Sequence, residues 1–287
     1  MEVAIDDLLD KIRNRKEDTN KGSFGHVFVL AGSKGLTGAA ALTSLAALRA
    51  GAGLVTLGIP ESLNAIMEVK LTEAMTLPLP ETSASSLSLS ALGKIKAFAE
   101  KCSVVVIGPG LSQNKETAKL VRKLIQELKT YIVLDADGLN AFQEYNDVKF
   151  LAKHQGKLII TPHPGEMSGL VKESIDIIQN NRKNIAANFS KEFNAVTVLK
   201  GHKTVVTSPK GLVYINQTGN PCLAKAGTGD VLSGVIAAFV AQGLGEFEAS
   251  VLGTYVHGEV ADKLAKKMGE VSIIASDIIE NLYLALK

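Results

Sequence analysis

The chain has 287 residues, of which 46% are hydrophobic, 21% are charged and 5% are aromatic. Because 31 Lys and Arg stand against 29 Asp and Glu, the net charge is only +2, which favours neither nucleic acid nor an acidic membrane surface as a partner. Cys102 and Cys222 form no metal-binding spacing and are typical of thiols in a reducing compartment. The N-terminus has no apolar signal-peptide core, and no apolar stretch reaches the ~18 residues of a membrane helix. We therefore expect a cytoplasmic protein with a substantial core and no nucleic-acid or membrane partner.

Short runs rich in Val and Ile alternate with longer segments of helical pattern. The runs are continuously apolar, as expected for strands that are buried on both faces of a sheet. They lie at 26–31, 53–59, 103–108, 131–136, 157–161 and 195–201, and the helical segments lie at 38–50, 113–129, 164–172 and 182–193. This order predicts an α/β fold in which helices flank a mainly parallel central sheet.

The alternation breaks at 195–216, where three short strand-like runs are separated by turn residues. This pattern predicts an antiparallel meander. Helical stretches follow near 229–242, 246–267 and 272–285. No linker divides the chain, so we expect one domain over residues 1–287.

The glycine-rich segment "GTGD" at 227–230 stands at the start of a predicted helix. Its glycines allow backbone N–H groups to converge on an anion, and Asp230 then lies in the first helical turn. The alternative is a plain capped helix, which an isolated segment of this kind would favour. The preceding stretch "NQTGNPCLAKA" is long and irregular, which is more typical of a functional loop than of a simple connector.

Further polar residues follow other predicted strands, where ligands of parallel sheets bind. In "TPHPGE", two prolines bracket His163, and Glu166 comes three residues later; the alternative is a helix-start cap with a surface histidine. Asp135 and Asp137 in "LDADG" suit Mg²⁺, although a turn with a cap is the simpler interpretation.

The segment "LKGHKT" at 199–204 could be only a hairpin turn, or its two lysines could face phosphate groups. The remaining histidines, His26, His154 and His257, show no metal-ligand spacing, and we interpret them as structural.

Taken in order, these motifs resemble those of the ADP/ATP-dependent NAD(P)H-hydrate dehydratases, a family of the ribokinase-like superfamily. The resemblance covers the chain from about Gly22 to its end and rests on "GSFGHVFVLAGSKGLTGAAALTSLAALRAGAGLVT", "VIGPGL", "LDADGLN", "TPHPGEM", "LKGHKT" and "KAGTGDVLSG". It implies a three-layer ribokinase-like fold without an N-terminal epimerase domain. In this superfamily an Asn-x-x-Glu normally stands where this chain has "HPGE", a change that the dehydratases share.

The resemblance also implies roles for individual residues. Asp230 would be the catalytic base that takes the proton of the substrate hydroxyl. The implied contacts with the hydrated dinucleotide are Ala39, Gly110, His163 and Asp230; those with the nucleotide are Lys200, Gly201, His202, Lys203, Thr204 and Gly229; and the candidate metal ligands are Glu166 and Asp135.

The implied reaction is the Mg²⁺-assisted, nucleotide-dependent dehydration of the S epimer of NADHX or NADPHX through a phosphorylated intermediate. The segment "TPHPGE" suggests ADP rather than ATP as the donor, and a separate protein would provide the NAD(P)HX epimerase. Relatives suggest a homo-oligomer, a tetramer. Two alternatives stay open: a small-alcohol kinase of the hydroxymethylpyrimidine or hydroxyethylthiazole type, which "HPGE" and residues 38–56 disfavour, and a non-catalytic nucleotide-binding sensor, which an intact Asp230 and Glu166 disfavour.

Overall fold

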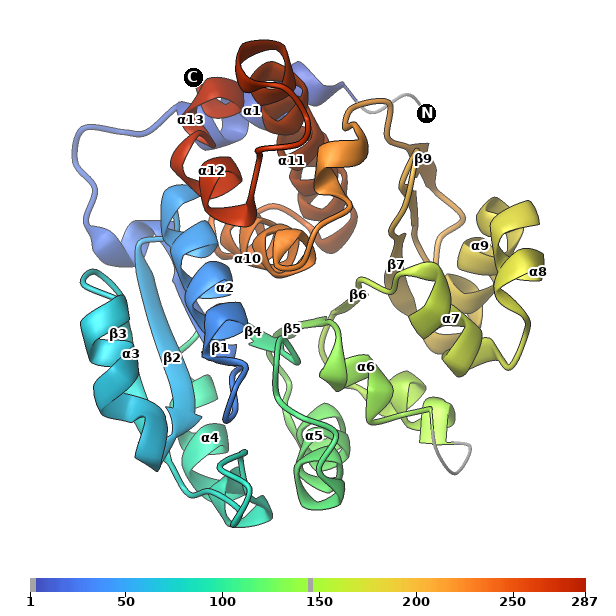
Figure 1. Cartoon of the computed structure of the whole chain (residues 1–287). Helices are drawn as coiled ribbons and strands as arrows, with labels where there is room; N and C mark the ends of the chain where they lie inside the picture. Colours follow the sequence, from blue (N-terminus) through green and yellow to red (C-terminus); the bar gives the residue numbers. More distant parts are fainter. Residues whose placement is uncertain (1–3, 144–146) are drawn as a thin grey trace.

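The computed structural model describes residues 4–143 and 147–287. One nine-stranded sheet with the strand order β3-β2-β1-β4-β5-β6-β7-β8-β9 runs through this part of the chain (Figure 1). Its strands are β1 (His26–Leu30), β2 (Leu54–Pro60), β3 (Met75–Leu79), β4 (Val104–Ile107), β5 (Tyr131–Leu134), β6 (Leu158–Ile160), β7 (Ala195–Leu199), β8 (Val205–Thr207) and β9 (Val213–Ile215). The pairs from β3 to β7 are parallel, and β7, β8 and β9 pair antiparallel. The mainly parallel sheet and the meander are both confirmed.

Helices cover both faces of the sheet and bury a separate apolar cluster on each. Successive strand residues point to opposite faces, so Val27 and Val29 join one cluster while Phe28 and Leu30 join the other. The helices of the first face are α1 (Ile5–Arg13), α2 (Thr37–Arg49), α3 (Asn64–Lys70), α10 (Thr228–Ala241), α11 (Glu246–Met268), α12 (Ala275–Glu280) and α13 (Tyr283–Leu286). Those of the second face are α4 (Leu92–Ala99), α5 (Lys115–Glu127), α6 (Asp137–Asn140), α7 (Pro164–Val171), α8 (Ile175–Asn180) and α9 (Arg182–Phe193).

Helix α10 is the most deeply placed helix of its layer, because 11 of its 14 residues are buried. It packs against α2 and α11 and against strands β1, β4 and β5, as Figure 1 shows. A helix that is apolar on all sides is stable only when it is enclosed in this way. The enclosed helix holds its first turn, which contains Asp230, in a fixed position relative to the sheet.

Several elements differ from the predicted ones for identifiable reasons. Strand β3 was not predicted, because Pro78 interrupts its apolar run; proline is tolerated there because β3 is the edge strand. The single helix predicted at 272–285 is wrong, since α12 and α13 are two short helices. Helices α1, α3, α4, α6 and α8 were also not predicted.

Both ends of the chain contribute to the same core cluster, which contains Leu8 from α1 and Leu282 from the segment before α13. A single domain requires such contacts, and the domain boundaries of 1–287 stay a prediction. None of the helices in the described residues is long and apolar enough to cross a membrane.

The contact between α10 and α2 depends on Gly234. A Cβ atom at this position would lie 2.3 Å from the carbonyl oxygen of Thr43 and 2.9 Å from the Cβ of Ala46. We predict that Gly234→Ala lowers the free energy of unfolding by about 1–3 kcal/mol, because the two helices must move apart. The measurement is the urea midpoint with its slope.

Gly93→Ala is the matched control, because Gly93 lies in helix α4 and a Cβ there would meet nothing within 4 Å. Its effect should be neutral or stabilising by up to ~1 kcal/mol, as the helix preference of Ala requires. Equal midpoints for the two variants would contradict the close contact between α10 and α2.

Candidate active site

Four charged side chains meet at the carboxyl ends of β5, β6 and β7 and at the start of α10: Asp135, Glu166, Lys200 and Asp230. The Lys200 ammonium donates to Asp135 Oδ1 at 2.7 Å, and its Nζ lies 3.8 Å from Glu166 Oε2. Ser233 in α10 donates its hydroxyl to the other Asp135 oxygen at 2.7 Å. Asp135 is 1% exposed, so this ion pair joins two strand ends to α10 inside the protein. We call these four residues the charged cluster.

The turn after β5 separates the two aspartates of the "DADG" segment. Ala136 has a φ of 49°, in the left-handed region that non-glycine residues rarely adopt, and it reverses the side-chain direction between its neighbours. Asp137 accepts the N–H of Ser112 at 2.9 Å and the amide of Asn140 at 3.1 Å, whereas Asp135 points to Lys200. The two carboxylates therefore do not act as one pair.

Asp230 is a half-buried residue in the first turn of α10. Burial raises its pKa to about 7, the charge of Asp135 adds to this, and Lys200 opposes the rise without cancelling it. The helix start has no side-chain cap, because the N-cap residue is Gly227, whose φ of 90° suits glycine. The Asp230 carboxylate thus stands beside free backbone N–H groups and can exchange a proton near neutral pH.

The other ionisable groups of the cluster are also shifted. Burial acts to lower the pKa of Lys200, but Asp135 and Glu166 outweigh it, so that the pKa is raised and the ammonium stays charged. Burial raises the pKa of Glu166, and Lys200 counteracts this. Three carboxylates thus face a single ammonium, an arrangement that favours retention of one proton in the cluster.

His163 and Glu166 form a capping box at the start of α7. The Nδ1 atom of His163 accepts the N–H groups of Gly165 at 3.0 Å and Glu166 at 3.1 Å, and Glu166 Oε2 accepts the N–H of His163 at 2.7 Å. The structure therefore confirms that His163 caps the start of α7. Because Nδ1 accepts hydrogen bonds, Nε2 carries the proton of the neutral ring. Nε2 lies 3.4 Å from Glu166 Oε1, and the His163 side chain is 55% exposed. This edge of the ring remains accessible to a ligand.

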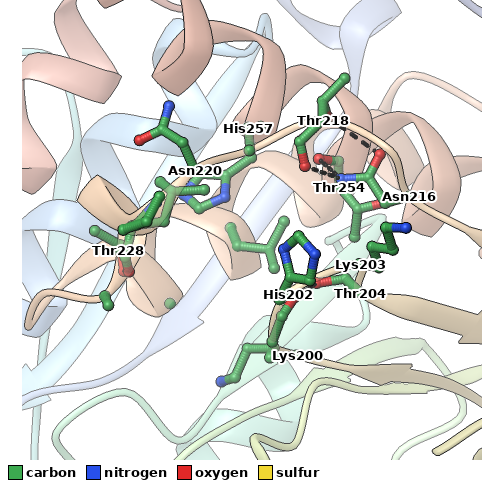
Figure 2. A pocket seen from close by; sticks show the side chains of 18 residues that line it. Lys200, His202, Lys203, Thr204, Asn216, Thr218, Asn220, Thr228, Thr254 and His257 are labelled. Carbon is green, nitrogen blue, oxygen red and sulfur yellow. Dashed lines mark hydrogen bonds between the residues drawn. The ribbon is translucent and has the colours of Figure 1, made fainter. Parts of the chain in front are cut away.

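A cavity of about 400 Å³ opens beside the charged cluster, and all six residues of the predicted nucleotide site line it (Figure 2). They are Lys200, Gly201, His202, Lys203, Thr204 and Gly229. The first five form the hairpin turn between β7 and β8, and a Cβ at Gly229 would lie 3.4 Å from Lys200 Nζ. The hairpin and the first turn of α10 thus lie close together and form one wall of the cavity.

Sequence reasoning missed several residues that complete this wall. The side chains of Asn216, Thr218 and Asn220 come from the loop that was noted for its irregular length, whereas Thr254 and His257 come from α11. The α11 residues gave no signal because they lie within an ordinary helical pattern. Arg182 of α9 was also missed; it donates to the carbonyl of Leu199 at 2.7 Å and to that of His202, and so braces the hairpin.

The first two predicted dinucleotide contacts lie next to each other at the start of α2. Gly110 has a φ of 62°, and a Cβ there would lie 3.1 Å from the Cβ of Ala39. Neither residue is among those that line the cavity. The Gly110 loop is connected to the charged cluster through Asp137, which holds Ser112 and whose charge contributes to the raised pKa of Asp230. Asp230 directly follows Gly229 of the cavity wall, and the charge of Asp137, which holds the Gly110 loop through Ser112, acts on its carboxyl group.

A metal site made by the protein alone is not formed in the described residues, where no three His, Cys, Asp or Glu side chains gather in a suitable cluster. Mg²⁺ commonly takes only one or two carboxylates and completes its shell with phosphate oxygens and water. Both oxygens of Asp135 already have protein partners, Lys200 and Ser233. Glu166 accepts the N–H of His163 with Oε2, whereas its Oε1 has only the longer contact of 3.4 Å with His163 Nε2. Glu166 is therefore the less constrained of the two predicted ligands, whose roles stay predictions.

Known proteins resemble this chain in sequence and in fold. A model of the family described as NAD(P)H-hydrate dehydratase matches residues 27–283. The ADP-dependent (S)-NAD(P)H-hydrate dehydratase of Neisseria meningitidis is 34% identical over 267 residues, which are 92% of this chain and 86% of the relative. The bifunctional NAD(P)H-hydrate repair enzyme Nnr of Moorella thermoacetica is 43% identical over 96% of this chain, which spans about half of that protein, 52%.

A solved structure of an ADP/ATP-dependent NAD(P)H-hydrate dehydratase from Bacillus subtilis, co-crystallised with ATP and Mg²⁺, superposes with a TM-score of 0.83. It is 28% identical, and the match covers 99% of this chain and 98% of that one. More distant ribokinase-like proteins share the architecture, so the predicted ribokinase-like fold is confirmed. The chain belongs to the NAD(P)H-hydrate dehydratase family.

Proposed function

We propose that this chain dehydrates the S epimer of hydrated NADH or NADPH, with ADP as the phosphoryl donor. The observation that carries the proposal is the place of Asp230 in the charged cluster, directly after Gly229 of a cavity lined by all six predicted nucleotide contacts, with a pKa raised to about 7. The names of the Neisseria relative and the Bacillus structure support the same activity.

The nucleotide would enter the cavity with its terminal phosphate toward Gly229 and Lys200. Backbone N–H groups at the start of α10 attract negative charge, and the Lys200 ammonium lies beside the same turn. Both groups are held before any ligand binds, because the Asp135 ion pair fixes Lys200. Preorganised donors of this kind stabilise the charge that develops on a transferring phosphoryl group.

The hydrate has a hydroxyl group on C6, next to the ring nitrogen, and hydroxide is a poor leaving group. Asp230 would accept the hydroxyl proton while the oxygen bonds to the terminal phosphorus of ADP and AMP leaves. The lone pair of the ring nitrogen then expels phosphate from C6. Loss of the C5 proton forms the C5=C6 double bond, so the products are NADH or NADPH, AMP and phosphate.

Magnesium fits this site as an ion held chiefly by phosphate oxygens, with the Glu166 carboxylate as its contact from the protein. Glu166 is buried and carries a raised pKa, so a neighbouring cation would favour its charged form. When bound, Mg²⁺ would neutralise phosphate charge. Lys200 supplies the fixed positive charge of the chain itself.

Several wider features belong to the same proposal. The dehydratase acts on one epimer, so a separate NAD(P)HX epimerase would supply it, as the bifunctional naming of the Moorella relative suggests. We also propose a cytoplasmic location and a homo-oligomeric, tetrameric assembly.

The direct test is to incubate the protein with chemically hydrated NADH, ADP and Mg²⁺ and to follow the absorbance of the regenerated dihydronicotinamide. We expect ADP-dependent recovery with release of AMP and phosphate. A stable phosphate ester in place of regenerated coenzyme would instead identify a small-alcohol kinase. Nucleotide binding without turnover of the hydrate would identify a sensor.

Asp230→Asn tests the base. The substitution keeps the shape of the side chain but removes proton acceptance, so we expect kcat to fall by ~10²–10⁴-fold while ADP still binds. In the wild type, kcat/KM should rise with pH through about 7, as Asp230 loses its proton. Near-normal activity of the Asn variant would contradict this role.

The same substitution should stabilise the folded protein. A carboxyl group whose pKa is raised on folding binds its proton more tightly in the folded state, so wild-type stability falls as pH rises from about 4 to about 7. Asp230→Asn removes this penalty. We expect the Asn variant to unfold at higher temperature than the wild type above pH 7 and to lose most of that advantage below about pH 4.

His163→Asn tests the contact with the hydrated dinucleotide. Asn keeps a side chain that can cap α7 but removes the imidazole Nε2 that faces outward. We expect kcat/KM for the hydrate to fall by roughly 10–100-fold, the value of one hydrogen bond to a charged or buried group. ADP affinity, measured by calorimetry without the hydrate, should change little. Loss of ADP binding with intact hydrate binding would show that His163 contacts the nucleotide instead, and would contradict this prediction.

A further inference from the structure

Asp137 is a carboxylate that the proposed reaction does not use, although it stands two positions after Asp135 of the charged cluster. Its Oδ1 atom accepts the side-chain amide of Asn140 at 3.1 Å, within the same short helix α6. Its Oδ2 atom accepts the backbone N–H of Ser112 at 2.9 Å, in the loop that follows β4. The Ser112 bond therefore joins the ends of β4 and β5, which pair in parallel as neighbours in the sheet (Figure 1).

The backbone on both sides of this hydrogen bond has an unusual conformation. Ser112, which donates, has a φ of 76°, and Ala136, which precedes Asp137, has a φ of 49°. Non-glycine residues rarely adopt this left-handed region, and they keep it only where surrounding contacts enforce it. The turn at Ala136 directs the Asp137 carboxylate to the loop, and the hydrogen bond in turn holds Ser112 in its strained conformation.

The loop held in this way, residues 108–112, carries the Gly110 contact predicted for the hydrated dinucleotide. Its other side is fastened to the segment after β1: Ser33 donates its hydroxyl to the carbonyl of Gly110 at 2.8 Å, and the N–H of Gly32 donates to the carbonyl of Pro109 at 2.9 Å. Gly110 is partly exposed, and its N–H has no acceptor among the described residues. Gly110 thus offers a backbone donor from between two fixed points.

Packing alone does not fix the Ser112 end of the loop. Leu111 is buried, but the next residue borders a second cavity of about 260 Å³, which Ser112, Asp137 and Asn140 line together with side chains of α5. A strained residue beside open space can relax when the contact that enforces its conformation is lost. The position of the loop therefore depends on the acceptor that Asp137 provides.

We propose that Asp137 is a positioning residue, which holds the 108–112 loop through the Ser112 N–H in the conformation that presents Gly110 to the hydrated dinucleotide. This proposal rests on the proposed function, since it takes Gly110 to contact the hydrate. It gives a task to the second aspartate of "DADG", for which the sequence left a metal site or a cap as alternatives. Asp137 is not among the residues that line the nucleotide cavity, so its effect should be confined to the hydrate.

The experiment compares Asp137→Asn with Asp137→Ala. Asn keeps an oxygen that accepts the Ser112 N–H, whereas Ala provides none. Burial is the main cause of the raised pKa of Asp230, and the charge of Asp137 contributes to it. Both variants remove this contribution, so a difference between them reports the hydrogen bond. We expect the KM for the hydrate to be about 10-fold higher in the Ala variant than in the Asn variant, with nearly equal kcat. ADP affinity, measured by calorimetry without the hydrate, should be the same in both.

Amide hydrogen exchange measures the loop without catalysis. The Ser112 amide should exchange about 10-fold faster in Asp137→Ala than in Asp137→Asn, because only the Ala variant frees it. The matched control is the pair Glu116→Gln and Glu116→Ala, because Glu116 also accepts a backbone N–H from a distant loop, that of Leu89 at 2.9 Å, and lines neither cavity. The two Glu116 variants should have equal KM values for the hydrate.

Equal KM values in the two Asp137 variants, whether raised or at the wild-type level, overturn the positioning role. A loss of ADP affinity in parallel with that for the hydrate also overturns it, since it would indicate a general structural role. Asp137→Leu, which likewise lacks an acceptor, serves if the Ala variant does not fold. A wild type that regenerates no coenzyme from the hydrate overturns the proposed function, and the positioning role with it, whatever the exchange rates show.

Discussion

The buried ion pair between Lys200 and Asp135 is the interaction on which the site depends. It joins the end of β7 to the end of β5, and through Ser233 it reaches α10. Removing either partner would leave an uncompensated charge in the interior, which typically destabilises a protein by about 3–5 kcal/mol. The hydrogen bonds of Asp135 to both neighbours satisfy its carboxylate and make the burial tolerable. The pair thus sets the positions of the hairpin and of α10 relative to each other.

Because Lys200 pairs with Asp135, the carboxylates of Glu166 and Asp230 are only partly compensated by its positive charge. Lys200 lies 2.7 Å from Asp135 but 3.8 Å from Glu166, and it does not cancel the effect of burial on Asp230. The result is a carboxyl group with a pKa of about 7, which suits a base that works near neutral pH. The raised pKa lowers the stability of the folded protein near neutral pH. Such a cost is common where side chains are arranged for catalysis rather than for stability.

Much of this could be predicted from the sequence, because the features concerned are local. Continuous Val and Ile runs marked the buried parallel strands, and the family resemblance of the short motifs pointed to six residues that the structure brings together around one cavity. Strand β3 was not predicted because proline excludes a central strand but is tolerated in an edge strand, and the sequence around Pro78 does not show which of the two applies. The contributions of Arg182 and His257 depend on which helices pack beside the hairpin and the cavity, and sequence spacing does not contain that information.

His163 shows a different limit. Its capping box satisfies a local rule, so the sequence alone could not separate a cap from a ligand contact, and the structure shows that Nδ1 serves the cap while the Nε2 edge stays accessible. One side chain can therefore fulfil both interpretations, through different ring nitrogens.

The central claim is that burial and the neighbouring carboxylates keep a proton on Asp230 up to neutral pH. The most direct measurement is a carbon NMR titration of protein labelled at the aspartate carboxyl groups, between pH 3 and pH 9, with the Asp230 resonance assigned by its absence from Asp230→Asn. The account predicts a midpoint at about 7 for this resonance. A midpoint near 4, the ordinary value of an aspartate, would contradict it.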